Sequence, residues 1–446
     1  MNRFLIIFLI IFLWTCSKSS PTSSDSQEQI NTPNFEGLRV EMMNNFSSTN
    51  RNTSWYITNQ RHNYIDLRHS GYRNMRYQNG SFQPLTGWGD EEKMWFQEIG
   101  SYFYTDLNND GSKEIWQTYL KAPWPSNQKE IVAYSLYPAK VLDTNQAASS
   151  DNLEPHFGLT QTRKAVLHDL NKDSRLEIIM FSHGLDNAEG TGDSLAIFHS
   201  NNTSSSQPSR IQYLSYIGHW HGGAVGDTDN NGYADIVGYN SNNTQSDYEL
   251  YTWFNNGQSF SGSRSDINRS NEEANMYTVE LFDLNKDSNL DLCLSRDANI
   301  TILWGDGSGT FDWQNKLVYI NPDSRDELAI DIDFLDFNLD GSIDLLLNYT
   351  DYDGMRIKVV SIKDNQFQDL TPELFLDETE IYDYNFWAKW LYIKDINGDG
   401  FLDILADGIF SSNSNNFPHT GESLYWINDT SGKFSMVRGF SSIANP

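Results

Sequence analysis

The stretch DFNLDGSID at residues 336–344 decides how this chain folds, because its pattern occurs six times. The pattern is Asp, any residue, Asn or Asp, any residue, Asp or Asn, three variable residues and an acid. Successive copies start 53 to 63 residues apart. A single copy would be an ordinary polar turn, but turn chemistry does not require acids at positions 1 and 9 six times. The other copies are DLNNDGSKE at 106–114, DLNKDSRLE at 169–177, DTDNNGYAD at 227–235, DLNKDSNLD at 283–291 and DINGDGFLD at 395–403.

Oxygen-bearing side chains at alternate positions of a tight loop are typical of a site for a hard cation. Ca²⁺ takes six to eight oxygen ligands at such sites, so the sequence predicts about six calcium sites. Position 7 varies, as expected where only a backbone carbonyl coordinates, and Gly occupies position 6, where the chain turns sharply, in four loops. The predicted ligands at positions 1, 3, 5, 7 and 9 are Asp106, Asn108, Asp110, Ser112, Glu114, Asp169, Asn171, Asp173, Arg175, Glu177, Asp227, Asp229, Asn231, Tyr233, Asp235, Asp283, Asn285, Asp287, Asn289, Asp291, Asp336, Asn338, Asp340, Ser342, Asp344, Asp395, Asn397, Asp399, Phe401 and Asp403.

The residues around the loops exclude an EF-hand. An EF-hand places a Glu at position 12 between two helices, and no copy has an acid there. Short apolar runs follow the loops instead, such as IIM at 178–180, LCL at 292–294 and LLL at 345–347. Runs of this length, bounded by turn residues, indicate buried strands. Each loop is therefore predicted to be the tip of a hairpin, and Cys293 a buried thiol.

The period predicts the architecture, because about 55 residues hold four strands with their turns. Outer hairpins are indicated at 248–260, 300–313 and 423–437, where aromatic and β-branched residues flank Gly-containing turns. Residues 36–100 are interpreted as a further unit, with MRYQNGSFQPL (75–85) as its outer hairpin and acid-poor YIDLRHSGY (64–72) replacing its metal loop. Four-stranded sheets repeated around an axis form a β-propeller. The fold predicted for residues 35–446 is therefore all-β, a seven-bladed β-propeller of four-stranded blades with calcium-binding hairpin loops.

The loops and their period resemble FG-GAP/VCBS repeats, the family that builds the integrin α-subunit propeller and many bacterial surface proteins. Residues 162–202 and 218–240 are especially similar to bacterial secreted members. The resemblance implies Ca²⁺ at the strand hairpins on one face and a ligand on the opposite face or the rim.

The N-terminus predicts export. Residues 1–15 combine a basic start with an apolar run too short to span a membrane, as in a signal peptide. The run ends at Leu13 to Cys16 in a sequence that resembles a bacterial lipobox, which predicts a lipid anchor at Cys16; a plain secretory signal is the alternative. Polar residues 16–34 indicate a flexible tether. The protein is therefore expected to be exported, either as a lipoprotein anchored in the periplasm or at the cell surface, or as a secreted protein.

The net charge of −29 limits the partners. Six Ca²⁺ ions would return only 12 positive charges, so the surface would stay acidic. Nucleic acid and anionic lipid surfaces are therefore not expected as partners, and membrane contact is expected only through the lipid anchor.

A second candidate site is a ligand pocket that contains His183, His219, Trp220 and His221. Such a cluster could hold Zn²⁺ or a sugar; alternatively, the histidines pack at strand ends and hydrogen-bond the neighbouring turns. Aromatic segments at 55–60, 122–127 and 385–390 are further candidates for a sugar platform on the rim.

No nucleophile elbow, P-loop or zinc-protease helix occurs, and no catalytic residue is assigned. The predicted function is therefore an exported calcium-binding module that recognises a protein or glycan at the cell surface. The alternative is a propeller enzyme, a lyase or hydrolase acting on extracellular polysaccharide.

Overall fold

The computed structural model describes part of the chain in detail. The residues described are 38–61, 75–78, 81–84, 96–105, 114–121, 133–139, 158–160, 162–182, 184, 192–199, 210–240, 249–266, 277–323, 327–350, 354–375, 381–383, 390–407 and 424–438. The predicted signal peptide at 1–15, the lipid-anchor residue Cys16 and the tether at 16–34 lie outside them.

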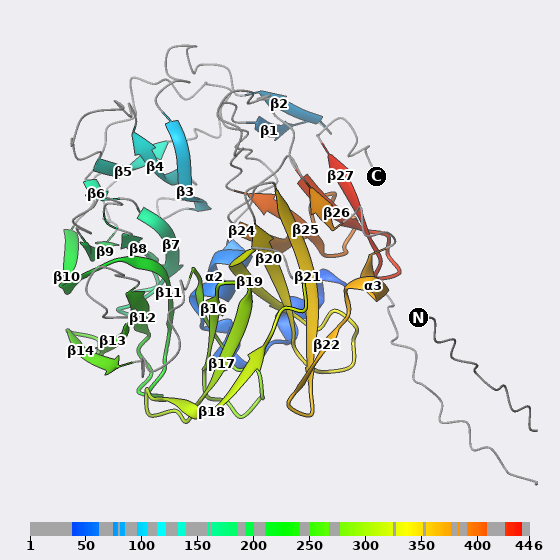
Figure 1. Cartoon of the computed structure of the whole chain (residues 1–446). Coiled ribbons are helices and arrows are strands. Elements are labelled where there is room, and N and C mark those ends of the chain that lie inside the picture. The colour runs from blue at the N-terminus through cyan, green and yellow to red at the C-terminus, as the bar shows by residue number, and fades with distance from the viewer. Residues whose placement is uncertain are drawn as a thin grey trace, which may run out of the picture.

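Five antiparallel four-stranded sheets make up most of the molecule (Figure 1). Their strands are β3 (Phe96–Thr105), β4 (Glu114–Lys121), β5 (Ala133–Ala139) and β6 (Gly158–Thr160); β7 (Thr162–His168), β8 (Glu177–Ser182), β9 (Asp193–His199) and β10 (Arg210–Gly218); β11 (Trp220–Gly226), β12 (Asp235–Asn240), β13 (Glu249–Asn255) and β14 (Phe260–Asp266); β15 (Val279–Phe282), β16 (Asp291–Arg296), β17 (Asn299–Gly305) and β18 (Phe311–Tyr319); β24 (Trp390–Lys394), β25 (Asp403–Asp407), β26 (Leu424–Asn428) and β27 (Phe434–Arg438).

Two further sheets differ from this pattern. One contains β19 (Leu328–Leu335), β20 (Asp344–Thr350), β21 (Met355–Lys363) and β22 (Gln366–Asp369), with β23 (Tyr382–Asp383) as a fifth strand on β21. The other is the hairpin of β1 (Met75–Gln78) and β2 (Ser81–Pro84). The described residues therefore form five four-stranded sheets, where the sequence predicted seven.

Successive sheets lie side by side, most of them through their first strands. Contacts join β3 to β7, β7 to β11, β11 to β15 and β19 to β24, and β16 to β19. In the five sheets whose acidic loops are described, the first strand ends at the loop and the loop leads into the second strand, so these loops share one end of the molecule. This arrangement is that of propeller-like blades.

The interpretation of residues 36–100 as a strand unit was partly wrong. Residues 38–61 form η1 (Val40–Asn45), α1 (Ser48–Arg51) and α2 (Ser54–Arg61). Helix α2 contacts the first strands β3, β7, β11, β15 and β24 and lies between the sheets in Figure 1. The predicted hairpin at 75–85 is confirmed as β1 and β2, whereas the segment 64–72 lies outside the described residues.

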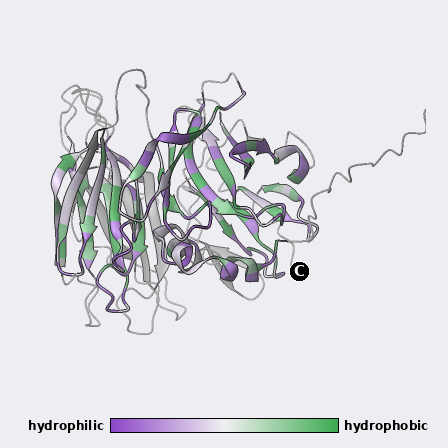
Figure 2. Cartoon of the chain, turned by 90° about the horizontal axis from the view of Figure 1, so that it is seen from below, coloured by the Kyte–Doolittle hydropathy of each residue, from purple (hydrophilic) through white to green (hydrophobic). Residues whose placement is uncertain are grey.

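The core follows from the sequence pattern of the strands. The second strands β8, β12, β16 and β20 are almost fully buried, because both faces of an inner strand pack against other parts of the molecule. Hydrophobic residues follow the strands in Figure 2, and hydrophilic residues gather in the connections. Cys293 is a fully buried free thiol, as predicted.

The outer hairpins predicted from aromatic and Gly-containing segments are also confirmed. They correspond to the pairs β13–β14, β17–β18 and β26–β27. A short helix, α3 (Thr371–Leu374), follows β22.

Candidate metal centres in the acidic loops

Five of the six acidic loops lie within the described residues, and they share one hydrogen-bonding pattern. The Asp at position 1 accepts a bond from the backbone N–H at position 6 at 2.8 to 3.2 Å. The side chain at position 3 accepts from the N–H at position 5, and position 5 accepts from the N–H at position 7. These bonds curl the loop around its own carboxylates. Residues 106–113 of the first loop, and the side chain of Glu114, lie outside the described part.

The acid at position 9 closes each loop at its base. It accepts the backbone N–H at position 2 at 2.8 to 3.0 Å in all five loops. In three of them its other oxygen accepts the N–H of a residue in the outer hairpin, namely Asn255, Gly305 or Asn428. The position-9 acids are at most 2% exposed. In those three loops the acid therefore links its loop to the body of its sheet.

The backbone of each loop is left-handed at two positions. Position 6 has positive φ in all five loops, with Gly in three and Ser174 or Ser288 in two. Position 4 is also left-handed, at φ 56° to 79°, and is occupied by Lys172, Asn230, Lys286, Leu339 and Gly398. Glycine at position 6 was predicted from the sharp turn; the second left-handed position was not. Non-glycine residues tolerate this conformation only at a cost in free energy, so hydrogen bonds from the loop must offset it.

The loop at 227–235 shows how closely the acids approach. Oxygens of Asp227, Asp229 and Asp235 lie within 4.8 Å of one another, the one such group of potential metal ligands in the described part of the chain. Oδ1 of Asp227 is buried without a hydrogen-bond partner, and Oδ1 of Asp283 in the next loop is in the same situation. An ionised carboxylate can only accept hydrogen bonds. Both oxygens therefore lack the cation or donor that their burial requires.

Burial also changes the pKa values of the loop acids. Burial raises the pKa of Asp291, Asp344 and Asp403 to about 7 and that of Asp235 to about 6. Burial also raises the pKa of Asp227, and its neighbour Asp229 adds to the shift. Carboxylate and amide oxygens that have no positive partner suit Ca²⁺. The donor set and the buried orphan oxygens thus fit the ion that the sequence predicts.

The structure describes only part of the predicted histidine pocket. His183 lies outside the described residues. Trp220 is fully buried, and its Nε1–H donates to the carbonyl oxygen of Asp193 at 3.1 Å, so its ring is not open to a ligand. His219 is 6% exposed, and the ring of His221 lies 5.1 Å from that of Tyr277. A ligand at these histidines stays a prediction.

The structure also describes part of the aromatic segments that were predicted to form a sugar platform on the rim. The proposal for residues 55–60 was wrong, because they belong to α2 and Trp55 is 5% exposed. Trp390 is also buried, as the first residue of β24. Residues 122–127 and 385–389 lie outside the described part.

A family comparison matches the centre of the chain. The model of the FG-GAP-like repeat matches residues 283–347, which run from the acidic loop of one sheet into the second strand of the next. The chain contains an FG-GAP-like repeat. The match begins at the loop that follows β15 and ends within β20, so it covers the loop-to-loop period that the sequence predicted. No curated protein matches the chain in sequence.

Solved structures resemble the chain at low identity. A lectin from Agrocybe aegerita, described as recognising non-reducing terminal N-acetylglucosamine, is 15% identical, with 83% of this chain and 88% of that chain covered and a TM-score of 0.48. The Tc holotoxin pore of Photorhabdus luminescens is 13% identical over 84% of this chain and 14% of its own, with a TM-score of 0.32. A yeast heterotrimeric nucleoporin complex is 10% identical over 84% and 96%, with a TM-score of 0.31. Nothing about the ligands of these proteins transfers to the chain at such values.

Sequence reasoning missed a group of charged residues inside the first strands. Lys164 of β7, Glu280 of β15, and Asp331 and Asp333 of β19 are each 6% exposed or less. A signal was present, because the strand segment IDIDFL at 330–335 places acids at alternate positions within an apolar run. Such acids face one side of a strand, and here that side is the centre of the molecule, where α2 lies.

Proposed function

We propose that the chain is an exported, calcium-stabilised propeller that serves as a binding module for a protein or glycan at the cell surface. The observation that carries the metal part is the shared geometry of the five described loops, with buried carboxylate oxygens that lack a positive partner. With the first loop, about six sites would hold Ca²⁺. In the described residues, no helix is long and apolar enough to cross a bilayer.

We further propose that the seven sheets close into a ring. The N-terminal segment supports closure, because it joins the acidic loop of the last described sheet. The N–H of Val40 donates to the carbonyl of Gly400 at 3.1 Å, and the N–H of Leu402 donates to the carbonyl of Leu38 at 2.6 Å. Residues from the two ends of the chain thus share one set of backbone hydrogen bonds.

Calcium stoichiometry tests the metal sites. Equilibrium dialysis of the purified protein against Ca²⁺ should give about six ions per chain, and the double variant Asp227→Asn, Asp229→Asn should lose one. The change Asp312→Asn, at an exposed acid outside the loops, is the matched control and should lose none. An unchanged stoichiometry in the double variant would rule out this loop as a calcium site.

Recognition and catalysis are separated by one pair of assays. The calcium-loaded protein is applied to a glycan array and to surface-protein extracts, and turnover is measured on every glycan that binds. Binding without product supports the module, whereas product formation supports the polysaccharide lyase or hydrolase. If the protein neither binds nor turns over any of these molecules, the binding module and the enzyme are both contradicted.

A further inference from the structure

The centre of the molecule contains a small acidic pocket that lies apart from the metal loops. Its volume is about 40 Å³, and its walls come from α2 and the first strands β7, β15, β19 and β24. Lys164 and Trp390 lie near the starts of their strands, whereas the acidic loops follow the strand ends. The pocket is therefore displaced along the strands toward the end opposite the acidic loops.

Negative charge exceeds positive charge at this pocket. Lys164 forms an ion pair with Glu280 and donates to the carbonyl oxygen of Val279 at 3.1 Å. Asp331 and Asp333 line the same pocket and are 5% and 2% exposed. One lysine thus faces three acids in a region from which water is largely excluded, and burying unpaired charge is costly.

The hydrogen bonds of the pocket leave acceptors unused. Oδ1 of Asp333 accepts from Nε1–H of Trp55 at 2.7 Å, but its Oδ2 is buried without a partner. Asn59 donates through Nδ2 to the carbonyl of Trp55, and its Oδ1 is also buried without a partner. Oδ2 of Asp331 accepts from the N–H of Leu391 at 2.7 Å. The pocket is rich in acceptors, so the group that suits it is a donor with positive charge.

We propose that this pocket binds the terminal ammonium group of a primary amine carried on a narrow chain. An ammonium group has three N–H donors, and the acceptors that the pocket offers them are the unpartnered oxygens of Asp333 and Asn59 and the carboxylate of Asp331. It is close to a water molecule in size, and a cavity of about 40 Å³ admits one or a few such groups. The rings of Trp55, Trp390 and Tyr392 also line the pocket and would contact the adjacent methylenes.

The observed contacts favour an amine over a metal ion or a sugar. The three acids of this pocket do not form a convergent ligand group; among the residues described, only Asp227, Asp229 and Asp235 do so. Aromatic walls attract organic cations, and Nζ of Lys164 already lies 5.9 Å from the centre of the Trp390 ring. A pyranose ring is too large for the space.

Proton exchange should accompany binding. Burial raises the pKa of Asp331 to about 7; the charge of Glu280 adds to this rise and that of Lys164 opposes it. Burial also raises the pKa of Asp333 well above its usual range. Burial also raises the pKa of Glu280, against the effect of Lys164. The raised pKa values favour the protonated form of these acids in the free protein, and an ammonium group would favour the ionised form, so binding should release protons.

Methylammonium is the probe, titrated into the full calcium-loaded chain and followed by tryptophan fluorescence at constant ionic strength with KCl. We expect saturable binding with proton release, and no saturable binding of tetramethylammonium, which has no N–H donor. The change Asp333→Asn keeps an acceptor for Trp55 and removes the charge, so affinity should fall at least tenfold. Asp312→Asn, at an exposed acid on β18, should leave it unchanged.

A second variant keeps the test decisive if Asp333→Asn fails to fold. Asn59→Leu removes the other unpartnered oxygen and should weaken methylammonium binding several-fold. The proposal is overturned if the unaltered chain does not bind methylammonium, or if it binds tetramethylammonium equally well. It is also overturned if K⁺ itself saturates the pocket, or if Asn59→Leu binds methylammonium as well as the unaltered chain does. These outcomes do not depend on which glycan or protein the molecule recognises.

Discussion

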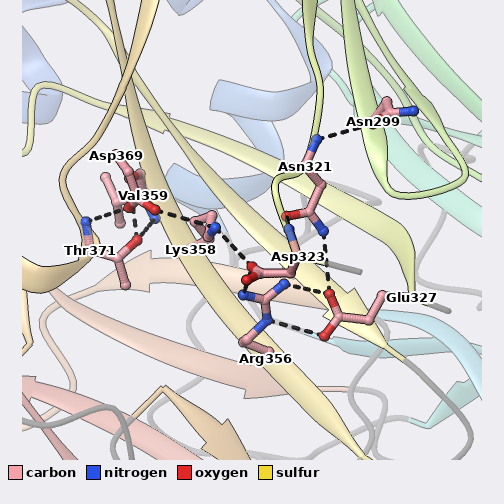
Figure 3. Close-up of polar contacts among 9 residues, drawn as sticks. All are labelled: Asn299, Asn321, Asp323, Glu327, Arg356, Lys358, Val359, Asp369 and Thr371. Carbon is pink, nitrogen blue, oxygen red and sulfur yellow. Dashed lines mark hydrogen bonds and ion pairs between the residues drawn. The ribbon is translucent and has the colours of Figure 1, made fainter. Parts of the chain in front are cut away.

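At the scale of single residues, buried acids differ in whether a positive side chain reaches them. Glu327 is 3% exposed and accepts two bonds from the guanidinium of Arg356, one of them from Nε at 3.1 Å (Figure 3). Lys358 completes the network by pairing with Asp323 and Asp369. By contrast, the hydrogen bonds described for Asp291 and Asp403 come from backbone N–H groups alone. Glu327 thus has a positive partner within the chain, whereas the charge of Asp291 and Asp403 remains to be balanced by a cation.

The raised pKa values of the loop acids predict the pH dependence of the calcium-free protein. The pKa of Asp291, Asp344 and Asp403 is about 7 in the fold and about 3.9 in an unfolded chain. The folded state then binds more protons than the unfolded state between these values, so the stability that these acids contribute is lost as the pH rises through about 7. We expect the melting temperature without calcium to fall from about pH 5 to about pH 8, as measured by calorimetry.

Saturating Ca²⁺ is the control for this experiment. The ion takes the place of the protons, so the decline above pH 6 should become smaller. A melting temperature that increases steadily over the same range without calcium would contradict the assignment.

The Arg356 network predicts a large cost for removing one charge. Glu327→Gln leaves the buried guanidinium of Arg356 without its main counter-charge, and breaking a buried pair in this way typically costs about 3–5 kcal/mol. Asp369→Asn removes an exposed partner of Lys358 and should cost less than about 1 kcal/mol. Urea unfolding of both variants measures the difference, and similar values would show that burial is not what matters.

At the scale of elements, the N-terminal helices hold the first strands and loops together. Asn50, in α1, donates to the carbonyl oxygen of Asp283 at 3.1 Å and accepts from its N–H at 2.7 Å. Ser54 accepts the N–H of Val225 at 2.9 Å, and Nε2 of His168 lies 2.8 Å from the carbonyl oxygen of Asn52. Residues 50–54 thus hold together β7, β11 and the loop that follows β15.

Replacing Asn50 by Ala removes both contacts with Asp283. The backbone groups of this buried residue would lose their partner, which typically costs about 1–3 kcal/mol. We also expect weaker calcium binding at the loop 283–291, because Asp283 is its first residue. Asn44→Ala, at an exposed position of η1, is the control. Isothermal titration with Ca²⁺ and urea unfolding would detect the effect, and equal behaviour of the two variants would contradict it.

At the scale of the whole molecule, calcium is expected to decide stability. Extracellular calcium modules bind with Kd of about 10⁻⁴–10⁻³ M, so each site adds about 0.4–1.4 kcal/mol at about 1 mM Ca²⁺. Six sites would add on the order of 2–8 kcal/mol to a fold whose total stability is typically about 5–15 kcal/mol. EDTA should therefore lower the melting temperature sharply, and added Ca²⁺ should restore it. A melt unaffected by EDTA, with no metal in the purified protein, would defeat the calcium proposal.

Much of the fold could be predicted because its determinants are local. Alternate acids, a short apolar run and a Gly-containing turn recur along the chain, and each acts within a few residues. The hairpins β13–β14, β17–β18 and β26–β27 and the buried Cys293 were predicted on this basis. Residues 38–61 could not be assigned in the same way, because four of the five first strands that α2 contacts, β7, β11, β15 and β24, lie more than a hundred residues further along the chain.

The sequence by itself determined the repeating strand pairs, the acids that surround each loop and the thiol in the core, because these depend on neighbours along the chain. Only the tertiary structure decided that a helix lies among the first strands and that Lys164, Glu280, Asp331 and Asp333 meet around it. It also decided which acids are buried, and so which of their pKa values rise. The physical reason is that burial and charge depend on the side chains gathered around a residue, and here those side chains come from several different sheets.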